Sequence, residues 1–189
     1  MSFRQGLRLR NINSIIPIAA FLSFTCLAAP HDKRTTYTDI TLYAYGQNIS
    51  GLPILYGNAD GLAYIGNATT ANFTSALSWD IDTSRDVAWN ATVVNGTAGG
   101  QLYIVNGGSS NVAAGFATAN TTLPTNATTS GFSLFGGQVV YIDSDSQFLS
   151  QFWATETFDG FWLLTWNSDG AHRDNSVPVT VKMIPPASS

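Results

Sequence analysis

Short runs of aromatic and β-branched residues recur along the chain after residue 35, and Gly, Asn, Asp or Pro separates one run from the next. Such runs predict short β-strands. No stretch shows the 3.6-residue apolar spacing of an amphipathic helix. The pattern therefore predicts an all-β chain with twelve strands, at residues 38–45, 52–56, 62–65, 77–81, 87–94, 101–105, 115–118, 132–135, 139–142, 148–156, 161–166 and 177–184.

Three turns between these strands have a clear physical basis. Gly136-Gly137 can supply the positive φ angles of a tight hairpin. The Asp-Ser-Asp-Ser run at residues 143–146 consists of side chains that bond their own backbone in turns. Asp159-Gly160 can close a further hairpin. Together these signals predict a four-stranded antiparallel meander over residues 131–167.

Residues 106–114 and 119–129 are rich in Gly, Ser, Thr and Asn, which is typical of loops. Many short strands with frequent turns favour one antiparallel β-sandwich or barrel, jelly-roll-like in layout. Residues 51–58 are weakly echoed at 61–67, so a β-trefoil stays open as the alternative. No linker-like change of composition divides residues 35–189, and we expect one domain there.

The first 29 residues have the pattern of a signal peptide. Arg4, Arg8 and Arg10 precede an apolar stretch at residues 15–29 that ends in small residues. The stretch is short for a membrane span, which needs about 20 apolar residues. An uncleaved signal anchor is the alternative interpretation.

Lys33-Arg34 follows at once and resembles the dibasic site that fungal secretory proteases cut. Cleavage there would make residues 30–34 a short propeptide and Thr35 the first mature residue. The alternative is an ordinary exposed basic pair. The C-terminal residues 185–189 lack the hydrophobic tail of a lipid-anchor signal, so we expect no membrane attachment after the signal is removed.

Seven Asn-x-Ser/Thr triplets without Pro in the middle position are the densest motif in the chain. They begin at Asn48, Asn67, Asn72, Asn90, Asn95, Asn120 and Asn126. Such a triplet accepts an N-linked glycan only in a chain that enters a secretory pathway. With the predicted signal peptide, the triplets predict a secreted, extracellular eukaryotic glycoprotein.

The predicted removal of residues 1–34 would change both the net charge and the cysteine content of the chain. Three basic and eleven acidic residues would remain, a net charge of −8. A surface of that sign repels phosphate backbones, so we expect no nucleic-acid partner. Cys26, the only cysteine, lies in the predicted signal peptide, so the mature chain would have no disulfide. Its length is sufficient to bury a core without one.

Groups for acid–base or nucleophilic catalysis are sparse. Glu156 is the single glutamate, and Asp80, Asp82 and Asp159 are among its candidate partners for glycan hydrolysis. Asp80 and Asp82 should share one face of a strand. His172 lies in a polar segment without a nucleophile elbow, which favours a solvated loop histidine. We expect no catalytic residues and no enzyme.

Metal ligands are equally sparse, and we expect no metal and no cofactor. Cleavage after Pro30 would expose His31 as an N-terminal copper ligand, but cleavage at the dibasic pair would remove it. The spaced oxygens of Asp143 and Asp145 could touch Ca²⁺, yet the other ligands of a calcium loop are missing. A plain hairpin turn is the favoured interpretation.

Aromatic residues are the remaining signal for binding. In the run 161–166, alternation puts Trp162, Leu164 and Trp166 on one face of a strand. An exposed row of tryptophans, with Trp153 on the preceding strand, would stack against the sugar rings of a cell-wall polysaccharide. The alternative, which Leu164 favours, is that this face forms the hydrophobic core.

The layout of the mature chain resembles small secreted fungal cell-wall glycoproteins of the phialide cell-wall type. The similarity lies in the β-motifs at residues 41–45, 100–105, 131–143 and 160–166. It implies an extracellular or wall-associated, non-enzymatic role and supplies no catalytic residue. We therefore expect a non-enzymatic secreted fungal glycoprotein. A lectin-like carbohydrate-binding module is the alternative, and a glycan-active enzyme built around Glu156 is the weaker one. Ligand identity and oligomeric state stay open.

Overall fold

The computed structural model describes residues 35–67, 72–108, 111–157 and 160–187, all within one compact unit, Asp32–Ser189. The predicted signal peptide and the Lys33-Arg34 site lie outside the described residues. None of these described segments contains a helix, and hence none contains a helix long and apolar enough to cross a membrane.

The described residues form sixteen strands, and this confirms the all-β prediction. In chain order they are β1 (Thr36–Ile40), β2 (Tyr43–Gly46), β3 (Ile49–Gly57), β4 (Ala63–Ile65), β5 (Thr74–Asp82), β6 (Asn90–Val93), β7 (Gly99–Val105), β8 (Val112–Ala113), β9 (Gly115–Ala117), β10 (Ala127–Thr128), β11 (Phe132–Phe135), β12 (Gln138–Ile142), β13 (Phe148–Leu149), β14 (Phe152–Glu156), β15 (Trp162–Trp166) and β16 (Ser176–Lys182).

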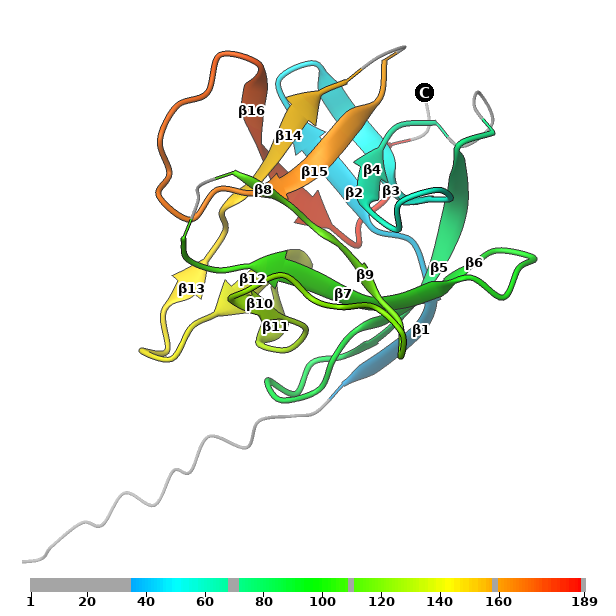
Figure 1. Ribbon diagram of the computed structural model, residues 1–189, viewed down its shortest axis with the longest axis horizontal. Coiled ribbons are helices and arrows are strands. Elements are labelled where there is room, and N and C mark those ends of the chain that lie inside the picture. Colours follow the sequence, from blue (N-terminus) through cyan, green and yellow to red (C-terminus); the bar gives the residue numbers. More distant parts are fainter. Residues whose placement is uncertain (1–34, 68–71, 109–110, 158–159, 188–189) are drawn as a thin grey trace, which may run out of the picture. The chain divides into compact units, whose positions relative to one another are not determined.

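Six of the strands close into an antiparallel barrel. The ring runs β2, β3, β4, β15, β14, β16 and back to β2, and every neighbouring pair is antiparallel. Figure 1 shows these strands together in the upper part of the view. The predicted class of antiparallel sandwich or barrel is confirmed. The six strands come from the beginning of the described chain, β2 to β4, and from its end, β14 to β16. A β-trefoil would need three equivalent segments, so the ring does not favour that alternative.

Further strands extend the sheet beyond the ring. β5 pairs with β3 and, on its other edge, with β6, from which the sheet continues through β7 and β9. β1 pairs with the end of β5, on the edge opposite β6. β11, β12 and β13 form a second extension that joins the ring through a Gln138–Lys182 bridge. These extensions are the parts of the fold that carry the candidate sites.

The core explains why these residues form these strands. Alternate residues of β5 are buried, and Leu77, Trp79 and Ile81 are 3% exposed or less. Trp89 and Phe132 meet in the same apolar cluster, with ring centroids 5.7 Å apart. Burial of such side chains is the main favourable term in folding. The described residues, which contain no cysteine, can therefore hold this fold by their core.

The predicted four-stranded meander is wrong in one respect. The β11–β12 and β14–β15 hairpins form as expected. However, β16 lies between β12 and β14 in the sheet order, so the two hairpins are not neighbours. Closing the ring requires a strand from the chain's end at that position, and local turn signals carry no information about such distant pairing.

Two predicted strands are also split in the structure. The run 38–45 divides into β1, which pairs with β5, and β2, which pairs with β3 and β16. The run 148–156 divides into β13 and β14. The two-residue strands β8 and β10 arise inside segments predicted as loops. Both form by pairing with distant strands, β15 and β7, and not from their own composition.

The turn predictions hold where they can be examined. Gly136 and Gly137 have φ angles of 59° and 81°, as the tight hairpin requires. Asp143 Oδ1 accepts hydrogen bonds from the backbone amides of Asp145, at 2.9 Å, and Gln147, at 2.8 Å. The run 143–146 is therefore a side-chain-stabilised turn. Asp159 lies outside the described residues.

Candidate functional site

All seven asparagines of the glycosylation triplets are exposed: Asn48, Asn67, Asn72, Asn90, Asn95, Asn120 and Asn126. Three of them occupy the left-handed region, with φ angles of 62° at Asn48, 61° at Asn95 and 63° at Asn126. Asparagine tolerates this conformation better than most residues. The exposure meets the physical condition for glycan attachment, and occupancy stays a prediction.

The triplets are unevenly distributed along the chain. None occurs after Asn126, although that part contains β10 to β16. No predicted glycan would therefore be attached to a residue of β11, β12 or β16. Large exposed apolar residues in this part include Phe135, Phe148 and Ile184.

The predicted tryptophan row is not exposed. Trp166 has no exposed area and lies 5.0 Å from Phe152 and 5.8 Å from Tyr141, measured between ring centroids. Trp162 is half-buried and packs against the core, and Leu164 lies in the core. The core alternative is therefore right for this face. Trp166 cannot stack on a sugar ring, and the proposed trio with Trp153 does not form a platform.

A different aromatic surface, which the sequence did not indicate, lies beside the β11–β12 hairpin. We define the Phe135 surface as Phe135, Phe148, Gln138, Ser150, Lys182 and Tyr45. Phe135 is 71% exposed and Phe148 is 62% exposed. Their ring centroids lie 6.0 Å apart, with 52° between the ring planes. Both rings thus present accessible area at one place.

Polar groups border these two rings. Gln138 lies opposite Phe135 across the hairpin and donates a hydrogen bond from Nε2 to Ser150 Oγ, at 2.8 Å. Lys182 lies opposite Gln138 on β16, and its Nζ is 5.4 Å from the centre of the Tyr45 ring. The combination of exposed rings with amide, hydroxyl and ammonium groups can bind a ligand that has both apolar faces and hydroxyl groups.

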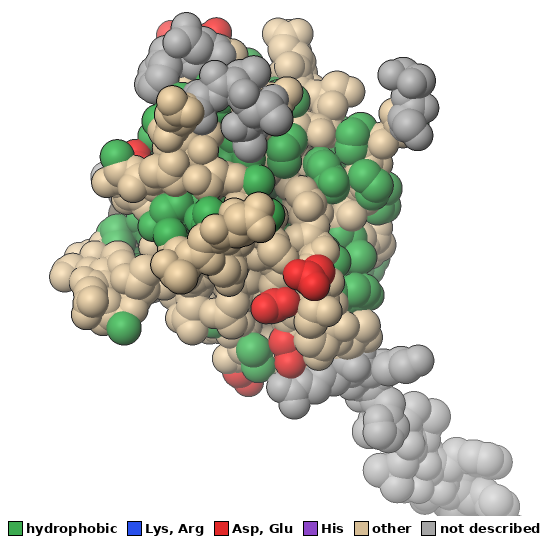
Figure 2. All heavy atoms as spheres, turned by 90° about the vertical axis from the view of Figure 1, so that its right-hand side faces the viewer, with side chains coloured by type: hydrophobic (Ala, Val, Ile, Leu, Met, Phe, Trp, Pro, Cys, Tyr) green, Lys and Arg blue, Asp and Glu red, His purple; other side chains and the backbone are tan. Residues whose placement is uncertain are grey.

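A groove lies between β1, β5, β6 and the β6–β7 turn. It has a volume of about 540 Å³, and its lining includes Asp39, Ser78, Asp80, Thr92, Val94 and Asn95. Asp39 has a φ of 54° in an irregular part of β1, and its Oδ1 accepts a hydrogen bond from Ser78 Oγ at 2.9 Å. Figure 2 shows carboxylates close together on this face, without a Lys or Arg side chain beside them.

Asp60 organises a small group of tyrosines near β4. Its carboxylate accepts hydrogen bonds from the Tyr64 hydroxyl, at 2.8 Å, and from the Leu62 amide, at 3.0 Å. Burial, followed by the hydrogen bond and charge of Asp60, raises the pKa of Tyr64 from 10.0 to about 12. Burial and the same charge also raise the pKa of Tyr103. Both tyrosines stay neutral at physiological pH, and Tyr64 donates its hydroxyl hydrogen to Asp60.

Among the described residues, the predicted carboxylate candidates Glu156, Asp80 and Asp82 have separate positions and contacts, and Asp159 lies outside the described residues. Glu156 is exposed at the end of β14, and Asp80 lies on the groove. Asp80 and Asp82 share the outer face of β5, as expected, but Asp82 Oδ1 caps the Ser84 amide at 2.8 Å. In the part of the chain that the structure describes, Glu156 lines neither the groove nor the smaller depression beside Arg85.

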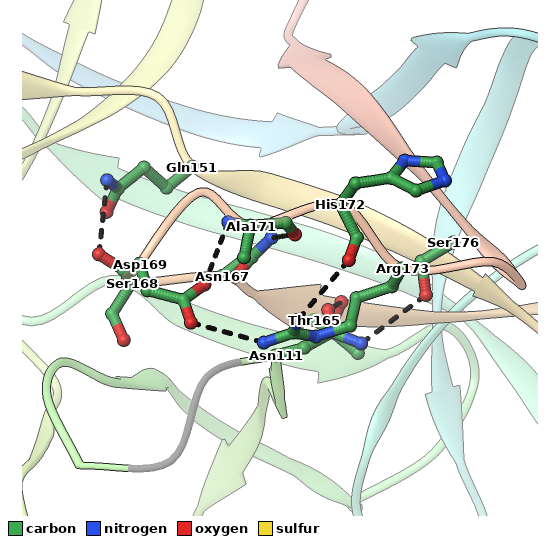
Figure 3. A network of polar contacts seen from close by, with 10 residues as sticks. All are labelled: Asn111, Gln151, Thr165, Asn167, Ser168, Asp169, Ala171, His172, Arg173 and Ser176. Carbon is green, nitrogen blue, oxygen red and sulfur yellow. Dashed lines mark hydrogen bonds and ion pairs between the residues drawn. The ribbon is translucent and has the colours of Figure 1, made fainter.

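His172 is a solvent-facing loop residue. Its side chain is 80% exposed, and Nε2 lies 3.7 Å from Asp174 Oδ1. Around it, Asp169 Oδ1 accepts a hydrogen bond from the Ala171 amide, and Asp169 Oδ2 lies 3.2 Å from Arg173 Nη2 (Figure 3). The loop interpretation of His172 is confirmed, because these contacts stabilise the turn and leave the imidazole outside it.

A polar network below this loop joins β8 to the barrel. Asn111 Oδ1 accepts a hydrogen bond from Thr165 Oγ1 at 2.6 Å, and Asn111 Nδ2 lies 3.4 Å from Ser176 Oγ (Figure 3). Thr165 and Ser176 are buried. Because buried hydroxyl groups need partners, Asn111 has a structural role here.

Within the described residues, no group of three His, Cys, Asp or Glu side chains is placed to hold a metal ion.

Comparison with known proteins adds no relative: no family model, no curated protein and no solved structure matches the chain. Function must therefore be argued from the sequence motifs and the geometry described above.

Proposed function

We propose that the protein is a non-enzymatic, N-glycosylated β-barrel protein secreted by a fungus and located in the cell wall or the medium. The observation that carries the proposal is the exposure of all seven triplet asparagines. The signal-peptide pattern and the dibasic pair supply the route on which those asparagines would be modified. The cysteine-free core is consistent with a domain that is stable without disulfides.

The non-enzymatic role is supported by the separation of the candidate catalytic groups. Glu156 is exposed at the end of β14 and lines neither described depression, whereas Asp80 lies on the groove and Asp82 bonds the Ser84 amide. Acid–base hydrolysis needs two carboxyl groups facing each other about 5–10 Å apart across a cleft. The weaker enzymatic alternative would need an Asp that faces Glu156 across such a cleft.

The proposal is tested by producing the full chain in a filamentous fungus and fractionating medium, wall and cytosol. We expect the protein in the medium or the wall, starting at Thr35, with a mass that falls after treatment with an N-glycosidase. A matched chain without residues 1–34 should stay in the cytosol unglycosylated. Cytosolic, glycan-free full-length protein would refute the proposal.

Carbohydrate binding is the second candidate, and the Phe135 surface is the observation that favours it. Exposed aromatic rings stack on the apolar faces of sugars, and the neighbouring amide and hydroxyl groups can bond sugar hydroxyls. A cell-wall polysaccharide is therefore the partner that this surface fits. The site differs from the tryptophan row that the sequence suggested.

A pull-down of the deglycosylated protein with insoluble chitin, β-glucan and cellulose tests this second candidate. Retention on one polymer should be lost in Phe135→Ala and Phe148→Ala. Leu123→Ala is the matched control, because Leu123 is also an exposed apolar residue but lies in the loop between β9 and β10, outside the Phe135 surface as defined above. Equal retention of all three variants, or no retention of the parent protein, would exclude the Phe135 surface as a polysaccharide site.

A further inference from the structure

The groove between β1, β5 and the β6–β7 turn has two glycosylation triplets at its border. Asn95 itself lines the groove, and so does Thr92, the third residue of the triplet that begins at Asn90. Asn90 lies directly opposite Asp80 in the β5–β6 ladder. A glycan on Asn95 would therefore start at the wall of the groove.

The chemistry of the groove matches a sugar. Asp39 and Asp80 provide carboxylate oxygens that accept hydrogen bonds from sugar hydroxyl or acetamido groups. Val94, which is 49% exposed, provides an apolar contact for a sugar face or a methyl group. The volume of about 540 Å³ lies within the range of small-ligand sites.

We propose that the first sugars of the glycan on Asn95 fold back into this groove and are held there by Asp39, Asp80 and Val94. This inference rests on the proposed function, because it requires a glycosylated chain. Attachment to Asn95 gives the sugar an effective concentration of about a millimolar or more, so weak contacts are sufficient to populate the docked state. The groove is then a site for the protein's own glycan and is closed to free sugars.

Site-resolved removal of glycans from the native glycoprotein tests the inference. A peptide N-glycosidase time course is followed by mass spectrometry of each glycopeptide. Asn48 is the matched internal control, because it also lies in an exposed turn with a φ of 62°, beside 61° for Asn95, and does not line the groove. We expect release from Asn95 to be about tenfold slower than from Asn48, which corresponds to about 1.4 kcal/mol of protection.

The variant Asp39→Gly/Asp80→Asn should bring the release rate at Asn95 close to that at Asn48. Glycine tolerates the positive φ of position 39 and, unlike asparagine, forms no new glycosylation triplet with Ile40 and Thr41. Asp145→Asn, in the distant 143–146 turn, should leave the protection unchanged. Circular dichroism and the unfolding midpoint confirm that each variant is folded.

Equal release rates at Asn95 and Asn48 would overturn the inference, and so would protection that persists in the double variant. An unmodified Asn95 in a protein with glycans on other triplets would also overturn it while leaving the proposed function intact. Absence of glycans from every triplet would refute both.

Discussion

At the scale of single residues, the structure separates aromatic side chains that stabilise the fold from those that face a partner. Trp166 is fully buried, whereas Phe148 is 62% exposed, although both belong to aromatic-rich strands. The sequence predicted that Trp162, Leu164 and Trp166 share a face, and this is right. Alternation is the same for both orientations, so only the apolar Leu164 between the two tryptophans favoured the inward orientation that the structure has.

Truncation of Trp166 and of Phe148 should therefore change the free energy of unfolding by very different amounts. Trp166→Ala should lower the free energy of unfolding by about 3–5 kcal/mol, because it leaves a cavity in the core. Phe148→Ala should change it by less than about 0.5 kcal/mol, as expected for a surface position. Denaturant unfolding of both variants measures the difference, and equal losses would contradict the assignment.

The environment of Tyr64 predicts how the stability of the fold depends on pH at the alkaline end. Its pKa in the folded state, about 12, exceeds the ordinary value of 10.0. The neutral form is therefore favoured by folding, and this contribution is complete below pH 10 and is lost as the pH rises through 12. Tyr64→Phe should weaken the loss of stability over that interval, measured by denaturant unfolding at several pH values. Tyr103 acts in the same direction, so some dependence should persist. An unchanged pH profile would contradict the role of Tyr64.

At the scale of elements, the segments with strong local patterns were predictable and those formed by distant contacts were not. The β11–β12 hairpin follows from Gly136-Gly137. β8, by contrast, is a two-residue strand that depends on pairing with β15 and on the side chain of Asn111. A sequence pattern carries no signal for such an element, since its stability comes from the surface on which it lies.

Asn111→Ala should detach β8 from the barrel. The change leaves the buried hydroxyl groups of Thr165 and Ser176 without their amide partner, and we expect a loss of about 1–3 kcal/mol. Hydrogen exchange should also accelerate at the amide of Ala114, which donates to the Leu164 carbonyl. Asn120→Ala, in an exposed loop, is the control in the unglycosylated protein. Unaltered exchange at Ala114 would show that Asn111 is dispensable.

At the scale of the whole molecule, the fold class could be predicted because short strands and turns are local signals, whereas the ring of six strands could not. Its closure joins β2 to β16 and β4 to β15, and both pairs are far apart in the chain. The glycosylation triplets were readable as motifs, and the structure adds that all seven of their asparagines are exposed. The Phe135 surface was not readable, because its members come from separate strands and meet only in the folded chain.

The central claim is that this barrel is a secreted glycoprotein, and intact-mass and glycopeptide spectrometry of the protein from fungal culture medium tests it most directly. We expect an N-terminus at Thr35 and glycans on the exposed asparagines, with a shift to the polypeptide mass of residues 35–189 after enzymatic deglycosylation. A full-length, unmodified chain that is found only inside the cell would contradict the claim.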